Sequence, residues 1–113
     1  MEVKSIITIL KGNLYNSCDL TKHYSKAFAS DLMSDCLSLI NEKCVLITGL
    51  INIQSIRTAE MLDLDFIIYV RGKKPTREMI EMADKHKISL ISTDYSMYEA
   101  SGLLYMNGIK PII

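Results

Sequence analysis

Three short apolar segments, Val45–Ile47, Phe66–Val70 and Ile88–Ile91, alternate with stretches in which apolar residues recur at helical spacing. Each apolar segment ends in a glycine or a polar turn before the next helical stretch begins. This alternation is typical of βαβ units, in which parallel strands are joined by crossover helices. The second segment is apolar at five consecutive positions, as expected for a strand covered by helices on both faces. The pattern predicts an α/β fold with a mainly parallel sheet of about four strands.

Elements are also predicted before the first of these segments. An amphipathic helix should end at Gly12, a brief strand should form at Leu14–Tyr15, and residues 16–22 should be a surface loop. Residues 24–29 could be extended, with Ser30 or Asp31 capping a second helix. The apolar stripes of the two helices are, for the first, Val3, Ile6, Ile7 and Leu10, and, for the second, Leu32, Met33, Cys36, Leu37 and Ile40.

The crossover helices and the C-terminus have similar signals. Thr76 should cap the helix after the second central strand, and Ser96 with Glu99 has the spacing of a capping box. The last helix should stop at Asn107-Gly108, and the apolar tail 109–113 should pack on the domain or on a partner. In the helix after the first central strand, we expect Ile53, Ile56, Ala59 and Leu62 to face inward and Gln54, Arg57, Thr58 and Met61 to be more exposed.

Size and composition limit the possible functions. The 113 residues suffice for one domain, residues 1–113, and 49% of them are hydrophobic, which predicts self-association as a homodimer. The formal net charge is zero and the charges are mixed along the chain, which argues against nucleic acid as a partner. No apolar run is long enough for a membrane span and the N-terminus does not resemble a signal peptide, so we expect a cytoplasmic protein without membrane contact.

The cysteines and histidines do not have the spacing of a cofactor site. Cys18, Cys36 and Cys44 form no C-x-x-C pair and are interpreted as buried free thiols in a reducing compartment. Only His23 and His86 could supplement them, so we expect no metal and no other cofactor. Neither histidine has an evident partner that would make it a general base.

The strongest candidate site follows the three central strands. Thr48-Gly49, Arg71-Gly72 and Ser92-Thr93 each come directly after a strand, and parallel strands end at the same sheet edge, where ligands of open α/β sheets bind. Arg71 and Lys74 could neutralise a phosphate or carboxylate there. The alternative is that the glycines only form turns and the basic side chains are solvated.

Catalysis has little support in the sequence. Neither G-x-x-x-x-G-K-[ST] nor G-x-G-x-x-G occurs, which disfavours a kinase or ATPase. Asp31 and Asp35 could share a helix face and act as an acid–base pair or hold a cation, although acids in a first turn more simply favour the helix dipole. Tyr95, Tyr98 and Tyr105 in the last helix suggest packing or a dimer contact. We therefore expect no enzymatic activity.

Several stretches together resemble the DRTGG domain in its short, stand-alone form. They are Ala29–Asp35, Val45–Gly49, Asn52–Gln54, Ile67–Pro75 and Leu90–Thr93, and the resemblance extends from about Val3 to Gly108. Two motifs differ. The chain has Gly49-Leu50-Ile51 where the family usually has Gly-Asp-Arg, and Val70-Arg71-Gly72 where it usually has Thr-Gly-Gly.

The resemblance implies a fold like the N-terminal domain of HPr kinase and a regulatory or dimerising module, since similar domains accompany CBS pairs, pyrophosphatases and phosphate acetyltransferases. The leading hypothesis is a homodimer that senses a small anion or nucleotide at the strand ends. The alternative is a purely structural interaction domain that docks on a hydrogenase or other redox enzyme. The residues expected to bind the ligand are Thr48, Gly49, Asn52, Gln54, Arg57, Arg71, Gly72, Lys74, Ser92 and Thr93.

Overall fold

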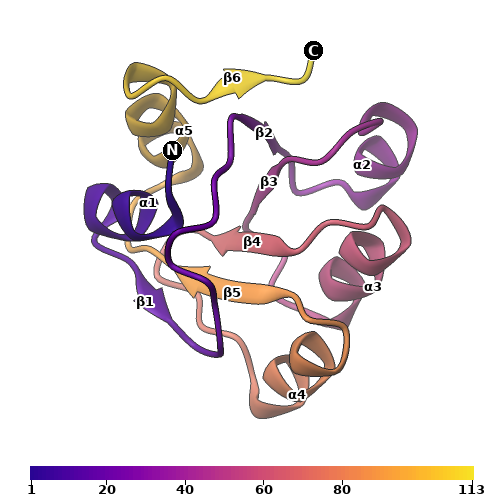
Figure 1. Ribbon diagram of the computed structural model, residues 1–113. Coiled ribbons are helices and arrows are strands. Elements are labelled where there is room, and N and C mark those ends of the chain that lie inside the picture. Colours follow the sequence, from indigo (N-terminus) through magenta and orange to yellow (C-terminus); the bar gives the residue numbers. More distant parts are fainter.

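The computed structural model describes residues 1–113 and contains one six-stranded sheet with helices on both faces (Figure 1). The predicted α/β class with a mainly parallel sheet is confirmed, with two more strands than expected. The elements in chain order are α1 (Val3–Leu10), β1 (Asn13–Leu14), β2 (Lys26–Ala29), α2 (Met33–Leu39), β3 (Val45–Thr48), α3 (Ile53–Met61), β4 (Phe66–Tyr69), α4 (Arg77–Lys85), β5 (Ser89–Ser92), α5 (Met97–Met106) and β6 (Lys110–Pro111).

The strand order is β1-β5-β4-β3-β2-β6. Only β1 is antiparallel to its neighbour, β5, and the remaining pairs are parallel. The brief strand predicted at Leu14–Tyr15 corresponds to β1, shifted by one residue, and the predicted extended segment 24–29 contains β2. Only β6 was not predicted as a strand. It has two residues and pairs with β2. The tail 109–113 therefore packs on its own domain, one of the two predicted arrangements, and Ile109 is buried.

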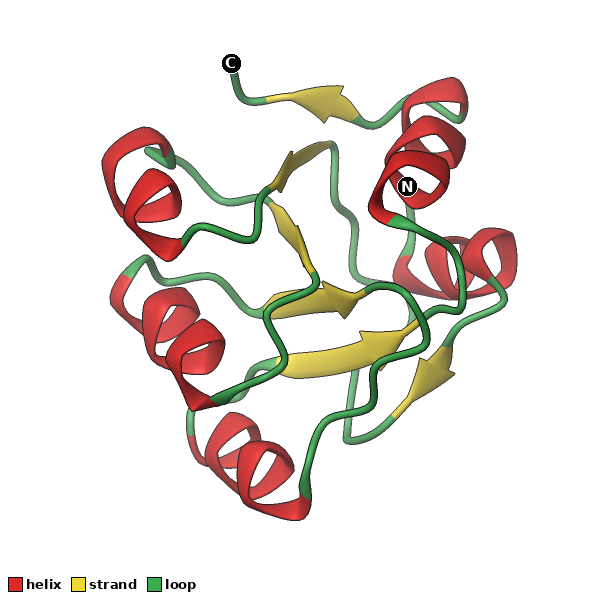
Figure 2. Ribbon diagram, turned by 180° about the vertical axis from the view of Figure 1, so that it is seen from behind, coloured by secondary structure: helices red, strands yellow, loops and turns green.

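Two apolar layers enclose the sheet. Helices α2, α3 and α4 cover one face and α1 and α5 cover the other, as seen from both sides of the molecule (Figure 2). Alternate residues of each central strand enter opposite layers: Leu46 and Ile67 face α3, whereas Val45 and Ile68 face α1 and α5. Successive side chains of a strand point to opposite faces of the sheet, and helices cover both faces here. The central strands are therefore hydrophobic at consecutive positions.

The helix ends largely follow the sequence signals. The hydroxyl of Thr76 accepts from the N–H of Met79, and that of Ser96 accepts from the N–H of Glu99, although Glu99 does not return the second bond of a capping box. The N-terminal helix ends at Leu10, and its C-cap residue Lys11, with φ 50°, comes directly before the predicted stop at Gly12. The last helix stops at Asn107, before Gly108 with φ 100°.

The predicted start of the second helix is wrong. Leu32 is the N-cap of α2 and no side chain caps it, because the Asp31 carboxylate is turned away toward β3. Asp31 thus lies outside the helix and does not share a helical face with Asp35. The stripe is also only partly buried: Met33, Cys36 and Ile40 enter the core, while Leu32 and Leu37 remain exposed.

Thr58 was expected on an exposed face of its helix, but it is buried. The reason is the position of α3 between α2 and α4, which narrows its solvent-exposed face (Figure 1). Its hydroxyl has no hydrogen-bond partner in the chain. The predicted inward positions Ile53 and Leu62 are only partly buried.

Cys36 and Cys44 are buried free thiols as predicted, and Cys18 is free but partly exposed. The longest helix has ten residues, and none of the helices has the length and hydrophobicity that crossing a membrane requires.

Candidate functional site

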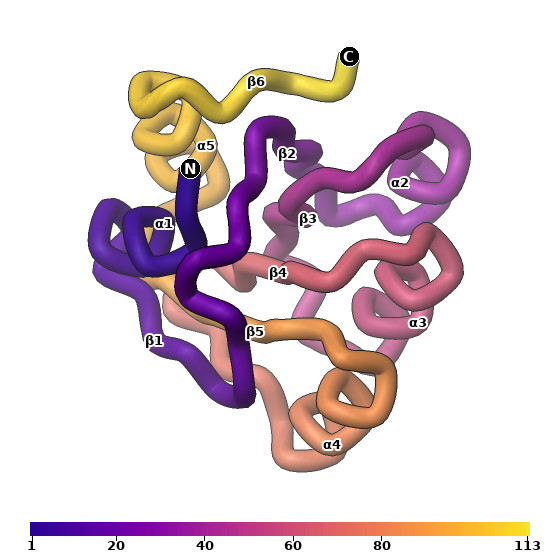
Figure 3. The backbone as a smooth tube through the Cα atoms, viewed as in Figure 1, coloured from indigo at the N-terminus to yellow at the C-terminus, as the bar shows by residue number.

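The C-terminal ends of the three central strands lie side by side. Thr48 pairs with Tyr69, and Tyr69 pairs with Ser92, so the residues that follow leave the sheet at one edge. The backbone path in Figure 3 shows the strand exits on this side, where the connections to α3, α4 and α5 begin. The sequence prediction of a common edge is confirmed, and the edge brings Gly49, Arg71 and Thr93 together.

Asp31 reaches this edge from the neighbouring strand. The ladder between β2 and β3 continues to Ser30, whose N–H donates to the carbonyl of Ile47 at 3.0 Å, and Asp31 follows directly. The N–H of Gly49 then donates to Oδ1 of Asp31 at 2.6 Å. The hydroxyl of Thr48 lies 3.4 Å from the same oxygen, a weak contact. An anionic group of the chain itself is therefore bound at the end of β3.

Arg71 completes the contacts of this carboxylate. One terminal nitrogen of its guanidinium lies 3.5 Å from Oδ2 of Asp31. The guanidinium also covers Gly49, and a Cβ atom at position 49 would overlap it. The absence of a side chain at position 49 lets the guanidinium approach this closely, and Gly49 is buried although it lies at the sheet edge. The Arg71 and Asp31 side chains themselves are 43% and 49% exposed, so the pair is accessible to solutes.

The backbone of the Arg71-Gly72 turn is used inside the fold. The N–H of Arg71 donates to the carbonyl of Tyr95 at 2.8 Å, and that of Gly72 to the carbonyl of Thr93 at 2.9 Å. Both residues have positive φ, 61° and 69°, a conformation that glycine tolerates better than arginine. The turn therefore holds the Arg71 side chain in place, while its N–H groups are not free to bind a ligand.

The predicted hydroxyls are also engaged within the protein. Thr48 accepts from the N–H of Leu50, Thr93 donates to the carbonyl of Leu10 at 2.7 Å, and Ser92 bonds to the hydroxyl of Tyr15 at 2.7 Å. All three side chains are buried. These hydrogen bonds fix the strand ends in position. A ligand at the edge would therefore contact the exposed Asp31 and Arg71 side chains instead of the hydroxyls.

The remaining predicted residues lie in the segments that follow β3 and β4, and they are exposed. Asn52 caps α3 by accepting from the N–H of Ser55 at 3.3 Å, whereas the N–H groups of Ile53 and Gln54 have no partner in the chain. The exposed side chains of Gln54, Arg57 and Lys74 make no ion pair or hydrogen bond. Helix N-termini attract anions through the dipole and through such unpaired N–H groups.

The side chains with shifted pKa values lie elsewhere. Burial raises the pKa of Tyr69, which bonds to Ser55 beneath the edge, to about 12, and that of Cys44 to about 12. At the opposite end of the sheet, burial acts against ionisation of Asp65, but hydrogen bonds from Lys22 and Tyr24 hold its pKa below the usual range. No group of three or more His, Cys, Asp or Glu side chains is arranged to hold a metal ion. The geometry of the edge is suited to binding an anion.

Asp31 was expected to cap a helix or to pair with Asp35, but it is part of this site. The available signal was its position two residues after the extended segment 24–29, which a parallel sheet would place at the same edge as Gly49. The nearby α2 made capping the simpler interpretation.

The fold is similar to that of a regulatory region whose structure is known. No model of a protein family matches the chain, and no curated protein matches it. Among solved structures, the chain is similar to the CBS and DRTGG domains of the regulatory region of Clostridium perfringens pyrophosphatase, which was crystallised with its activator diadenosine tetraphosphate. The TM-score is 0.73 at 19% identity, over 98% of this chain and 48% of that one, so the chain spans about half its length. This likeness supports a DRTGG-like fold for the chain.

Proposed function

We propose that this protein is a non-enzymatic regulatory module that binds a small anion, such as the phosphate of a nucleotide, at the carboxyl edge of its sheet. The observation that carries the proposal is the Asp31 carboxylate, which the N–H of Gly49 and the guanidinium of Arg71 hold at the end of β3. In the proposed bound state a ligand oxyanion takes the place of this carboxylate.

The Asp31 carboxylate is weakly enough held to be displaced. An exposed ion pair contributes about 0–1 kcal/mol, and this pair is nearly half exposed with a separation of 3.5 Å. A phosphate carries more charge and more acceptor oxygens than a carboxylate, and the arginine fork can bind it through two hydrogen bonds. The balance therefore favours phosphate at Arg71 once the ligand is abundant.

The surroundings of the ion pair support a ligand larger than phosphate. The unpaired N–H groups at the start of α3 and the exposed cations of Arg57 and Lys74 could contact further phosphates. The similar Clostridium perfringens regulatory region was crystallised with a dinucleotide activator, which supports a nucleotide as the class of ligand. The hydroxyls at the edge are all hydrogen-bonded within the fold, which supports a binding role over nucleophilic catalysis.

Calorimetric titration with phosphate, AMP, ADP, ATP and diadenosine tetraphosphate at constant ionic strength tests the proposal. Arg71→Asn removes the guanidinium and retains a residue that tolerates positive φ, so the fold should persist. We expect it to weaken binding by at least about tenfold, the effect of losing one charge-assisted bond. The matched control Lys85→Ala removes one exposed positive charge at the far end of α4 and should bind normally. Binding by none of the five ligands would contradict the proposal.

A second candidate function, protein interaction, has support from the surface of α5. Tyr98, Tyr105 and Met106 are 90%, 63% and 82% exposed, which is unusual for large apolar side chains on one helix. A homodimer is the simplest occupant of this surface, and nothing in the structure or the comparisons points to a redox enzyme. Analytical ultracentrifugation of the wild type and of Tyr98→Ser/Met106→Ser tests it. A wild-type monomer at high concentration would count against the homodimer.

A further inference from the structure

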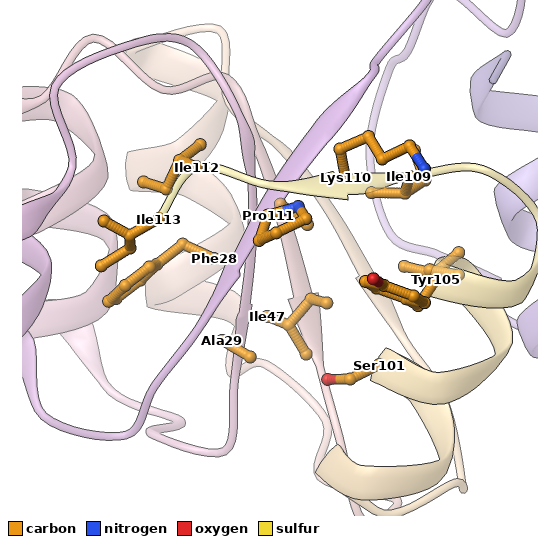
Figure 4. A pocket seen from close by; sticks show the side chains of 12 residues that line it. Phe28, Ala29, Ile47, Ser101, Tyr105, Ile109, Lys110, Pro111, Ile112 and Ile113 are labelled. Atoms are coloured by element: carbon orange, nitrogen blue, oxygen red, sulfur yellow. The ribbon is translucent and has the colours of Figure 1, made fainter.

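A cavity of about 270 Å³ lies between strands β2 and β3, α5 and the C-terminal tail with β6 (Figure 4). It is separate from the Asp31–Arg71 edge in that none of the residues of that ion pair line it. Nine of its twelve lining residues are hydrophobic. The walls include Ala27 and Ala29 of β2, Ile47 of β3, Ser101 and Leu104 of α5, and Pro111 of β6.

The cavity exists because small side chains face one another. Ala27 and Ala29 are small residues of β2, next to the larger Ile47 of β3, and Ser101 lies opposite them on α5. Larger residues at these positions would fill the space. The cavity is open to solvent on the side where Ala29, Lys110 and Pro111 are exposed. The tail closes one side through the short pairing of β6 with β2.

Ser101 adds a polar group that the fold leaves without a partner. Its Oγ atom is buried and makes no hydrogen bond, and in Figure 4 it points from α5 into the cavity, toward Ile47 and Ala29. A buried hydroxyl without a partner is unfavourable and is uncommon in native structures. A bound water would need two to four polar partners, and Ser101 is the only buried hydroxyl among the lining side chains. A ligand with a polar group can satisfy it better.

We propose that this cavity binds a small, largely apolar molecule that carries one hydrogen-bonding group, which pairs with Ser101. An apolar cavity of about 150 Å³ accommodates benzene, so 270 Å³ corresponds to a ligand of about eight to twelve non-hydrogen atoms. A phosphate or a purine would leave most of its polar atoms unpaired against these walls. The proposed ligand class therefore differs from the anion proposed for the strand-end edge, and this site does not depend on that proposal.

NMR titration of ¹⁵N-labelled protein with p-cresol tests the inference, with toluene as the matched probe that lacks the hydroxyl. Saturable shifts should be confined to residues of the cavity wall, such as Ala27, Ile47 and Leu104. The p-cresol affinity should exceed that of toluene by about three- to tenfold, the contribution of one hydrogen bond. Ser101→Ala should abolish this preference and leave toluene binding unchanged.

Ala29→Leu provides an independent variant, because the added side chain would occupy the cavity from an exposed position on β2, where it should not disturb the core. It should weaken both probes by about tenfold or more, and its amide spectrum reports whether the fold is retained. Non-saturable shifts in the wild type, or binding that neither variant changes, would overturn the proposal. Phosphate serves as the reference ligand and should leave the cavity resonances unmoved.

Discussion

Replacing Asp31 by alanine should lower stability and raise anion affinity at the same time. The substitution removes the carboxylate that accepts from the N–H of Gly49 at 2.6 Å and that pairs with Arg71. If this carboxylate occupies the ligand position, its removal exposes both donors to solvent anions. Most substitutions that lower the stability of a protein leave its ligand affinity unchanged or lower it. A lower stability together with a higher anion affinity would therefore distinguish this explanation from a general disturbance of the fold.

The expected magnitudes follow from the two contacts. A hydrogen bond to a charged group contributes about 1.5–3 kcal/mol, and the half-exposed position of Asp31 reduces this toward about 1 kcal/mol. The ion pair with Arg71 adds about 0–1 kcal/mol. The free energy of unfolding should therefore fall by about 1–2 kcal/mol, which lowers the Tm of a domain of this size by about 4–8 °C.

The gain in affinity has the same origin. In the wild type a ligand must first displace the carboxylate, and the energy of those contacts is subtracted from the binding free energy. Since 1.4 kcal/mol corresponds to a factor of ten, the affinity of the Asp31→Ala protein for pyrophosphate should rise by about tenfold. Urea denaturation measures the first effect and calorimetry the second.

Asp35→Ala is the matched control, because it removes the same charge from an exposed position in the first turn of α2. It should change pyrophosphate affinity little and stability by less than about 1 kcal/mol through the helix dipole. Reduced affinity in Asp31→Ala would refute the reasoning, because Asp31 would then belong to the binding site instead of occupying the position of the ligand. Unchanged affinity would separate anion binding from this edge altogether.

Three further predictions concern the core and the tail. Ile109→Ala should lower the free energy of unfolding by about 2–4 kcal/mol because Ile109 is buried beside α5, whereas Ile113→Ala, at a 72% exposed position, should change it by less than about 0.5 kcal/mol in urea titrations. Iodoacetamide near pH 8 should modify Cys18 in the folded protein and spare Cys44, because burial raises the pKa of the Cys44 thiol to about 12. Mass spectrometry of the intact protein measures the modification, and rapid modification of Cys44 would contradict this prediction. The free energy of unfolding should fall as the pH rises from about 10 to 12, because the pKa of Tyr69 is raised to about 12 in the folded state and the unfolded chain loses this proton at a lower pH. In Tyr69→Phe, the slope of the free energy of unfolding against pH should be smaller in this range by up to about 1.4 kcal/mol per pH unit.

The central part of the fold could be predicted because its signals are local. Continuous apolar segments of strand length, followed by capping residues such as Thr76 and Ser96, specify buried parallel strands and crossover helices. The strand β6 differs in this respect. It has two residues, and its pairing with β2 depends on where the sheet edge lies, which no local pattern encodes. The brief strand predicted at Leu14–Tyr15 does form as β1, but its antiparallel pairing with β5 could not be predicted from the local pattern.

The location of the candidate site in the fold could be predicted from the sequence, but the contacts between its residues could not. Parallel strand ends bring Gly49, Arg71 and Thr93 to one edge, and this follows from the βαβ pattern alone. The contact of Asp31 with Gly49 depends on β2 lying next to β3, and the sequence does not specify that strand order. Thr58 shows the same limitation, since its burial results from the position of α3 between two other helices.

The proposed function depends on the binding of an anion at the end of β3 in place of Asp31. An NMR titration of the wild-type protein with ADP at constant ionic strength, following the backbone amide of Gly49 and the side-chain Nε of Arg71, tests this binding. We expect saturable shifts of both resonances, with smaller shifts away from this edge. Unmoved Gly49 and Arg71 resonances at ADP concentrations up to about 10 mM, far above those at which a regulatory ligand should bind, would contradict it.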